Sequence, residues 1–333
     1  MRNILCVTLI ALLGGCTSTS VTEKYQDKRN DIINVKDKVI EFETGNVLIG
    51  SVSRLYMSNK CLLIADHKSV DKQIHIFNKN DFSYLTSIGN FGEGPEEITV
   101  MGCLAIDEAH HQLYVSDHAK QKIFSYDMDS VMVDSLYKPQ VKTAMNETLF
   151  PSEYQYINDT LSIAVLIKPT STSTFNQFLG RWNMNTGEMI PMKYTHPDIQ
   201  KKRITFAASE KAGIYVECYT RHDLMTICSL DGELLYNIYG PDWDGGNGNK
   251  LQSFGTVMIG NDKIFVSYCG EDYARDSFPT KILVFDLEGN YLKTLETGYK
   301  ISDCCYDSFN NRIILSLNDV VPVSYTHLRA HET

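Results

Sequence analysis

The chain repeats one pattern of short apolar stretches at a nearly constant spacing. "LLIADHKSVDKQIHIFNK" from Leu62 closely matches "LYVSDHAKQKIFSYDM" from Leu113. Similar apolar cores begin, in chain order, at Leu62, Leu113, Leu161, Ile214, Ile264 and Ile313, with spacings of 51, 48, 53, 50 and 49 residues. A period of this length built from short β runs is typical of a β-propeller blade, whereas one coil of a β-helix is much shorter.

Each period contains four candidate strands separated by turn residues. In the second period these are "GCLAID", "LYVSD", "QKIFSYD" and "VMVDSLY", in which β-branched and aromatic residues recur. No segment shows a convincing amphipathic helix pattern. The sequence therefore predicts an all-β, six-bladed propeller of four-stranded antiparallel blades whose last blade stops after two strands. Seven blades are the alternative if the sixth blade is followed by more chain.

One further strand candidate, "DKVIEFET" from Asp37 to Thr44, precedes the first inner strand and belongs to no blade. Propellers avoid open sheet edges by closing the ring. We therefore expect this segment to form the outer strand of blade six.

The N-terminus has the features of a bacterial secretion signal. Arg2 precedes an apolar run that ends at Leu13 and is too short to span a bilayer. The residues up to Cys16 resemble the lipobox of bacterial lipoproteins, which implies cleavage before Cys16 and acylation of that cysteine. An ordinary signal with a chance cysteine is the alternative. We expect a signal peptide over residues 1–15, a flexible tether over 16–36 and one propeller domain over 37–322.

The residue after the cysteine bears on localisation. Thr17 stands where retention in the inner membrane would favour Asp, and no acidic cluster of the surface-export type follows. We expect a lipid anchor in the outer membrane that faces the periplasm, with cell-surface display as the alternative.

At the other end, residues 323–333 ("VSYTHLRAHET") resemble a translated sequencing adapter, and we exclude them from the fold; a genuine polar tail is the alternative.

The net charge limits the classes of partner that the protein can bind, and the cysteine positions bear on disulfide pairing. The net charge of −10 disfavours nucleic acid, and membrane contact is expected only through the lipid on Cys16. The sequence leaves the oligomeric state open. There is no CxxC spacing. A hairpin that turns at Asp223 would bring Cys218 opposite Cys228, so the two form either a disulfide or a pair of buried thiols.

The repeats, the lipobox and the segment "IGNFGEGPEEI" from Ile88 to Ile98 together are similar to TolB-like six-bladed propeller lipoproteins of Bacteroidetes, which are akin to NHL propellers. Blade three departs furthest, because it lacks the Asp that ends the second strand at Asp66 and Asp117. Most members of this group have no assigned activity. The resemblance therefore implies a fold and not a reaction.

Loops that follow the second and fourth strands of each blade should gather on one face, which we call the loop face. Propellers usually bind their partners through such loops. Trp243, between Asp242 and Asp244, is the most site-like position, since an indole can stack on a sugar while carboxylates accept hydrogen bonds; a plain surface loop is the alternative. The candidate ligand-binding residues are His67, His118, Arg221, His222, Asp242, Trp243, Asp244, Glu271, Tyr273 and Arg275.

No metal site or cofactor is assigned from the sequence. Asp242 and Asp244 with Asn247 and Asn249 could hold Ca²⁺, but the EF-hand order and its bidentate Glu are missing. His67 and His118 occupy equivalent repeat positions and offer only two ligands, fewer than a catalytic zinc site needs. We expect the preceding Asp residue to cap the turn, with the histidine simply following it.

Catalytic motifs are missing as well. The sequence has no GxSxG, HExxH, P-loop or Rossmann fingerprint. A lactonase-type channel needs several carboxylates on the inner strands, which here offer mainly Glu153 and Asp303. We therefore predict a noncatalytic propeller that binds a protein or glycan through its loop face. The alternative is a hydrolase or lyase that acts on a sugar-derived substrate in the channel, with or without Ca²⁺.

Overall fold

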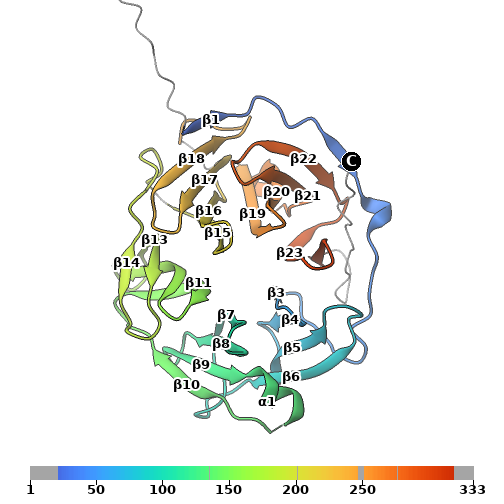
Figure 1. Cartoon of the computed structure of the whole chain (residues 1–333), viewed down its shortest axis with the longest axis vertical. Helices are drawn as coiled ribbons and strands as arrows, with labels where there is room; N and C mark the ends of the chain where they lie inside the picture. Colours follow the sequence, from blue (N-terminus) through green and yellow to red (C-terminus); the bar gives the residue numbers. More distant parts are fainter. Residues whose placement is uncertain (1–21, 135, 201, 247–250, 276, 319–333) are drawn as a thin grey trace, which may run out of the picture.

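The computed structural model is a ring of six blades around a central channel (Figure 1). It describes residues 22–134, 136–200, 202–246, 251–275 and 277–318. The predicted all-β six-bladed propeller is confirmed. The predicted signal peptide, the lipidation at Cys16 and the tail 323–333 lie outside the described residues. In the described ranges, no helix is long and apolar enough to cross a membrane.

Five blades are antiparallel sheets whose first strand lines the channel. The strands of blades 1 to 3 are β3 (Ser53–Met57), β4 (Cys61–Asp66), β5 (Lys72–Asn78), β6 (Tyr84–Asn90); β7 (Met101–Asp107), β8 (Gln112–Asp117), β9 (Lys122–Asp127), β10 (Gln140–Ala144); and β11 (Phe150–Asn158), β12 (Leu161–Pro169), β13 (Phe175–Trp182), β14 (Met189–Pro191). Those of blades 4 and 5 are β15 (Ile204–Ser209), β16 (Ile214–Tyr219), β17 (Leu224–Ser229), β18 (Leu234–Tyr239); and β19 (Leu251–Gly260), β20 (Lys263–Asp272), β21 (Lys281–Asp286), β22 (Tyr291–Glu296).

Blade 6 consists of two described strands, β23 (Ile301–Asp307) and β24 (Arg312–Leu317), as the repeat predicts. The inner strand β23 contacts β19 of blade 5 and β3 of blade 1. Asp303 joins these neighbours directly, because it accepts hydrogen bonds from the backbone N–H of Leu55 at 2.7 Å and from Thr256 Oγ1 at 2.6 Å. The ring therefore closes with six positions, and the seven-bladed alternative is wrong.

The segment before the first blade departs from expectation. β1 (Glu23–Tyr25) pairs in parallel with β18, and β2 (Ile32–Asn34) pairs in parallel with β22. The chain thus adds a fifth strand to the outer edges of blades 4 and 5 (Figure 1). The expectation of a flexible tether up to Lys36 is wrong for the described residues from Thr22 onward, because the outer strands offer unpaired backbone groups that this segment satisfies.

The predicted outer strand of blade six over Asp37–Thr44 is also wrong. A 3₁₀ helix, η1 (Lys36–Lys38), begins there, and no strand follows before β3. The ring of Phe42 stacks on Phe82 with centroids 4.0 Å apart and meets Phe77 edge-on at 6.4 Å. Aromatic packing on blade 1 therefore fixes this segment instead of strand pairing with blade 6.

Blade 2 contains a short helix where the sequence predicts its fourth strand. α1 (Met128–Val133) takes up the first three residues of "VMVDSLY", and the outer strand is β10 instead. The side chain of Asp127 accepts a hydrogen bond from the backbone N–H of Ser130 at 2.7 Å and so caps the helix. Val131 is buried against blade 2 and anchors the turn.

The core lies between neighbouring blades. Every residue of β4 and β16 is buried, because both faces of these second strands are covered by adjacent sheets. Cys218 lies opposite Met225, and Cys228 lies opposite Tyr215, so the two thiols do not face each other across the hairpin. All seven cysteines of the described residues are buried free thiols. The disulfide between Cys218 and Cys228 is therefore wrong, and the alternative of two buried thiols is confirmed.

Candidate functional site

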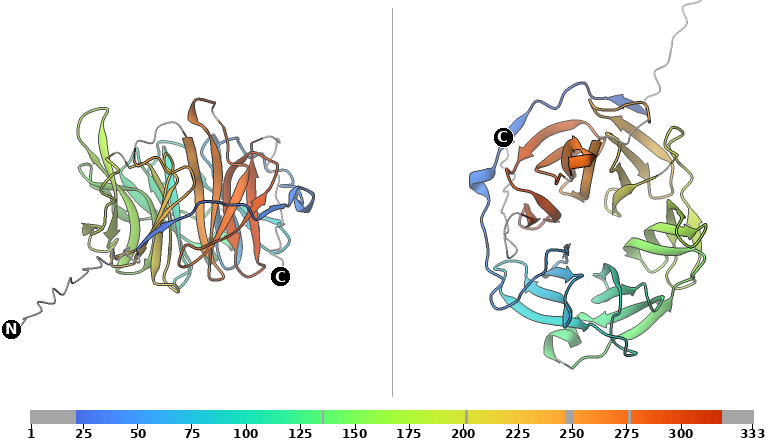
Figure 2. Two further views of the ribbon diagram at one scale, coloured as in Figure 1. Left: turned by 90° about the horizontal axis from the view of Figure 1, so that it is seen from above. Right: turned by 180° about the vertical axis from the view of Figure 1, so that it is seen from behind.

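Two long hairpins rise on either side of blade 4 on the loop face. β12 and β20 have 9 and 10 residues, whereas β16 of blade 4 has 6. Figure 2 shows both hairpins projecting on the same side of the disc. The surface of blade 4 between them holds several of the residues predicted from sequence. We call it the blade 4 surface and define it by Arg221, His222, Asp242, Trp243 and Asp244.

Trp243 rests on a base of rings. Its ring centroid lies 5.0 Å from that of Tyr239, 5.7 Å from that of His196 and 6.0 Å from that of His222. These three supporting side chains are buried, whereas Trp243 is half-buried. His196 Nε2 lies 2.9 Å from the Tyr239 hydroxyl, which donates to Glu23 Oε2 at 2.5 Å. The N-terminal strand β1 therefore helps to hold the indole in place.

Burial changes the pKa of the two histidines that support Trp243. It lowers the pKa of both His196 and His222, and the nearby Asp244 only partly offsets this effect at His222. Both imidazoles are therefore neutral at pH 7. Sequence reasoning missed His196, which follows the short outer strand β14 in a loop without repeat character. Its position in a loop after a fourth strand was the available signal.

The two carboxylates beside Trp243 have different surroundings. Asp242 Oδ2 accepts a hydrogen bond from the Tyr268 hydroxyl at 3.3 Å, and its backbone N–H donates to Asp223 Oδ2 at 3.2 Å. Asp244 is exposed, and its Oδ1 lies 3.9 Å from His222 Nδ1. Asn247 and Asn249 lie outside the described residues, so the structure does not test the four-residue calcium alternative.

A second contact joins blade 4 to blade 5. The guanidinium carbon of Arg221 lies 3.1 Å from the ring centroid of Tyr273, a cation–π contact. Tyr273 begins the 3₁₀ helix η2 (Tyr273–Arg275) after β20 and remains 46% exposed. Arg275 Nη1 of the same helix lies 3.6 Å from Glu271 Oε2 at the end of β20. The structure therefore brings Arg221 of blade 4 onto Tyr273 of blade 5 and pairs Glu271 with Arg275 on the same face.

His67 and His118 lie elsewhere in the ring, at the ends of β4 and β8 in blades 1 and 2 (Figure 1). Their backbone N–H groups donate to Val52 at 3.0 Å and Val100 at 2.8 Å. Burial lowers the pKa of both imidazoles. These histidines do not join the blade 4 surface.

The aspartates before these histidines shape the turns, as expected from the repeat. Asp66 accepts hydrogen bonds from the backbone N–H groups of Gly50 at 2.7 Å and Lys68 at 2.8 Å. Asp117 accepts from Thr99 at 2.9 Å and Ala119 at 3.0 Å. Each carboxylate thus ties the loop that enters its blade to the loop after the second strand.

The channel holds a 350 Å³ cavity lined by all six inner strands. Arg54 Nη1 lies 2.8 Å from Glu153 Oε1, and both side chains are more than one-third exposed, at 38% and 39%. Burial raises the pKa of Asp303, while the charge of Arg54 lowers it. Sequence reasoning found Glu153 and Asp303 but missed Arg54, although its place on the inner strand "SRLYMS" gave the signal. Glu153 is thus paired with Arg54, and Asp303 is held by hydrogen bonds from blades 1 and 5.

Comparison with known proteins supports the fold. The model of the family DUF5128, described as a 6-bladed beta-propeller, matches residues 17–176. A protein of Bacteroides fragilis described as exported superposes with a TM-score of 0.57 at 14% identity, covering 89% of this chain and 87% of its own. No curated relative matches the sequence.

Two further solved structures share the architecture. A member of the DUF4221 family from Bacteroides vulgatus has a TM-score of 0.58 at 10% identity and covers 87% of this chain and 95% of its own. A luciferin-regenerating enzyme has a TM-score of 0.55 at 8% identity, with coverages of 86% and 93%. At these identities the likeness concerns the propeller fold alone.

Proposed function

We propose that this protein is an exported, noncatalytic β-propeller that binds a protein or glycan partner through its loop face. The observation that carries the proposal is the half-buried Trp243 on its buried ring base, beside exposed Asp244 and within the same face as the Arg221–Tyr273 pair. Of the two partner classes, the geometry favours a glycan.

The chemistry of the blade 4 surface fits a sugar ring. The exposed part of an indole offers an apolar face, and its buried part is fixed by Tyr239, so little side-chain entropy is lost on binding. Asp244 can accept hydrogen bonds from sugar hydroxyls. Tyr273 adds a second exposed aromatic ring, held in place by Arg221. The two hairpins of the flanking blades project on the same face (Figure 2).

The proposed location is the outer membrane, with the propeller anchored by lipid on Cys16 and facing the periplasm in preference to the cell surface. The signal-like N-terminus supports this proposal, as does the likeness of the fold to a Bacteroides fragilis protein described as exported. Labelling with radioactive palmitate in a Bacteroides host tests the anchor. Incorporation should be lost in Cys16→Ala, and equal labelling of both proteins would contradict it.

Binding is tested by titrating the full-length protein with a panel of neutral and acidic oligosaccharides while recording the heat of binding by isothermal titration calorimetry, a signal that does not depend on Trp243. Trp243→Ala should weaken binding by about tenfold or more, the typical effect of removing a central aromatic anchor. Trp182→Phe is the matched control, because Trp182 is buried in blade 3 at 2% exposure. If no oligosaccharide binds, a partner protein captured through Trp243 would point to the second class. Full binding by Trp243→Ala would overturn the site.

The channel supports the alternative of a hydrolase or lyase less well. General acid–base chemistry needs a carboxyl group free to exchange a proton with substrate. Glu153 is paired with Arg54, and Asp303 accepts hydrogen bonds from blades 1 and 5. Turnover of a sugar-derived substrate that is lost in Glu153→Gln would favour this alternative.

A further inference from the structure

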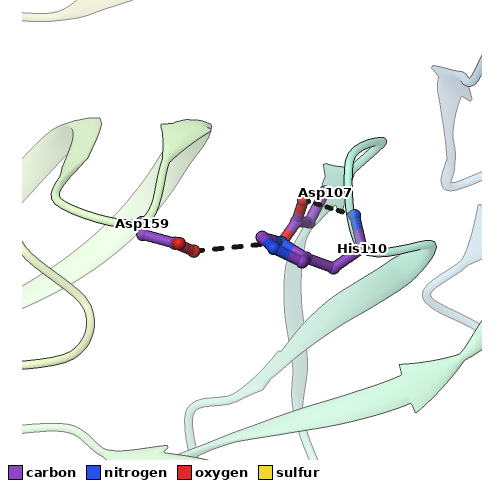
Figure 3. A group of neighbouring side chains, drawn as sticks. All are labelled: Asp107, His110 and Asp159. Carbon is purple, nitrogen blue, oxygen red and sulfur yellow. Dashed lines mark hydrogen bonds and ion pairs between the residues drawn. The ribbon is translucent and has the colours of Figure 1, made fainter.

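The face opposite the loop face carries a group of three metal-ligating side chains from two blades. Asp107 and His110 flank the turn between β7 and β8, and Asp159 lies in the turn between β11 and β12 (Figure 3). His110 Nδ1 lies 2.8 Å from Asp107 Oδ2 and 3.9 Å from Asp159 Oδ1. One ligand atom from each residue lies within 4.8 Å of the other two. The imidazole therefore sits between the two carboxylates.

Neighbouring hydroxyl groups orient both carboxylates. Asp107 is 1% exposed and accepts a hydrogen bond from the Tyr114 hydroxyl at 3.1 Å. Asp159 accepts from the Tyr156 hydroxyl at 2.6 Å. Such outer hydrogen bonds are typical of carboxylates that ligate metals. The group borders a cavity of 600 Å³, and the side chains of His110 and Asp159 are 57% and 60% exposed, so an ion can reach it.

The equivalent turn in blade 6 shows which part of this arrangement the fold needs. There, Asn310 donates to Asp307 from its backbone N–H at 3.2 Å and from Nδ2 at 2.7 Å. His110 makes the same two contacts with Asp107, at 3.2 Å and 2.8 Å. The turn therefore requires a side-chain donor but not an imidazole. Blade 2 supplies the imidazole, and Asp159 of blade 3 places a second carboxylate beyond it.

We propose that Asp107 Oδ2, His110 Nδ1 and Asp159 Oδ1 bind a divalent first-row transition-metal ion of the Zn²⁺ type. Two carboxylates and one imidazole suit such an ion, whereas Ca²⁺ takes six or more oxygen ligands. Zn²⁺ with bonds of about 2.0–2.2 Å separates tetrahedral ligand atoms by roughly 3.3 Å. The distances of 2.8 Å and 3.9 Å bracket that value.

Binding requires little rearrangement. The ion takes the place of the proton on His110 Nδ1, which leaves to solvent, and the exposed side chain of Asp159 closes the remaining gap. Three protein ligands leave a fourth position for water or a ligand. This site lies on the opposite face from Trp243, so the metal proposal can be tested independently of the proposed partner site.

The test is isothermal titration calorimetry of the full-length, metal-stripped protein with ZnCl₂. We expect one tight site that is weakened about tenfold or more in His110→Asn and in Asp159→Asn. His110→Asn reproduces the Asp307–Asn310 turn of blade 6, so its melting temperature without metal should match that of the wild type.

His111→Asn is the matched control. His111 Nδ1 pairs with Asp129 at 2.7 Å on the same face but has no second carboxylate in the group. Its zinc affinity should equal that of the wild type. The proposal is overturned if the wild type binds no Zn²⁺, if His110→Asn and Asp159→Asn bind it unchanged, or if His111→Asn weakens binding as much as they do.

Discussion

Arg29 Nη1 lies 2.8 Å from Asp223 Oδ1, and this ion pair joins the segment between β1 and β2 to the loop of blade 4. Both side chains are almost fully buried, at 7% and 0% exposure. The guanidinium also lies 5.4 Å from the ring centroid of Tyr268 in blade 5. The pair therefore fastens the N-terminal segment at the junction of two blades, close to the blade 4 surface.

Arg29→Met should destabilise the fold by about 3–5 kcal/mol, because it leaves the charge of Asp223 buried without its partner. Chemical denaturation measures the loss. The matched control is Arg181→Met, whose partner Asp231 lies at 2.9 Å in an exposed pair and should contribute less than about 1 kcal/mol. Equal effects from both substitutions would show that burial does not govern this pair.

The fluorescence of Trp243 should report protonation of its neighbours. Burial lowers the pKa of His196 and His222, so the neutral forms stabilise the fold above about pH 6.5 and that stability is lost as the pH falls through the lowered values. An imidazolium beside the indole quenches its emission. The difference spectrum between wild type and Trp243→Phe should therefore titrate below about pH 6.5. A midpoint at or above that value would contradict the burial of both imidazoles.

Arg54→Met should destabilise the protein more at pH 7 than at pH 5. Burial raises the pKa of Asp303, so its contribution to stability is complete at low pH and is lost as the pH rises through the folded value. Removal of the Arg54 charge raises that pKa further, so ionisation of the buried Asp303 costs more stability as the pH rises. We expect a loss of about 1–2 kcal/mol at pH 7, measured by urea unfolding, with Glu153→Gln as the milder control. A loss independent of pH would contradict the coupling.

The seven buried cysteines should resist modification in the native protein. Burial raises the pKa of Cys103 to about 12 and that of Cys228 to about 11, so almost no thiolate is present at pH 8. Iodoacetamide labelling followed by peptide mass spectrometry should find these sites unmodified until denaturant is added. Rapid native labelling of Cys218 or Cys228 would show that the blade 4 hairpin opens.

Much of the ring is readable from sequence because its second strands are buried on both faces. Every residue of β4 and β16 is buried, so each of these strands is a short, mainly apolar stretch that marks one blade. Asp66 and Asp117 recur because the same turn needs the same carboxylate. Where packing repeats, the residues repeat with it.

The errors fall where packing does not repeat. β1 and β2 have three residues each, too few for a strand pattern, and they depend on edges that lie about 200 residues further along the chain. α1 forms because Asp127 caps it, although "VMVDSLY" also alternates like a strand. The conformation of these elements depends on contacts with neighbouring residues that cannot be recognised in the local sequence.

The candidate site residues also divide into those that the repeat pattern predicts and those that it does not. Trp243, Asp242 and His222 were found because loops after even-numbered strands share one face. His196, Arg54 and the group of Asp107, His110 and Asp159 were missed, because their meaning comes from partners in other strands or blades. The contact of Asp107 with His110 becomes informative only when Asp307 and Asn310 show what the turn requires.

The parallel pairing of β1 with β18 also constrains the order in which parts of the chain fold. Residues 23–25 align with residues 237–239, so the start of the chain cannot reach its final place until blade 4 has been made. Pairing over such a separation is slow, because a long loop must close before any contact rewards it. The segment that precedes the first blade is therefore among the last parts of the described chain to be fixed in place, although it is made first.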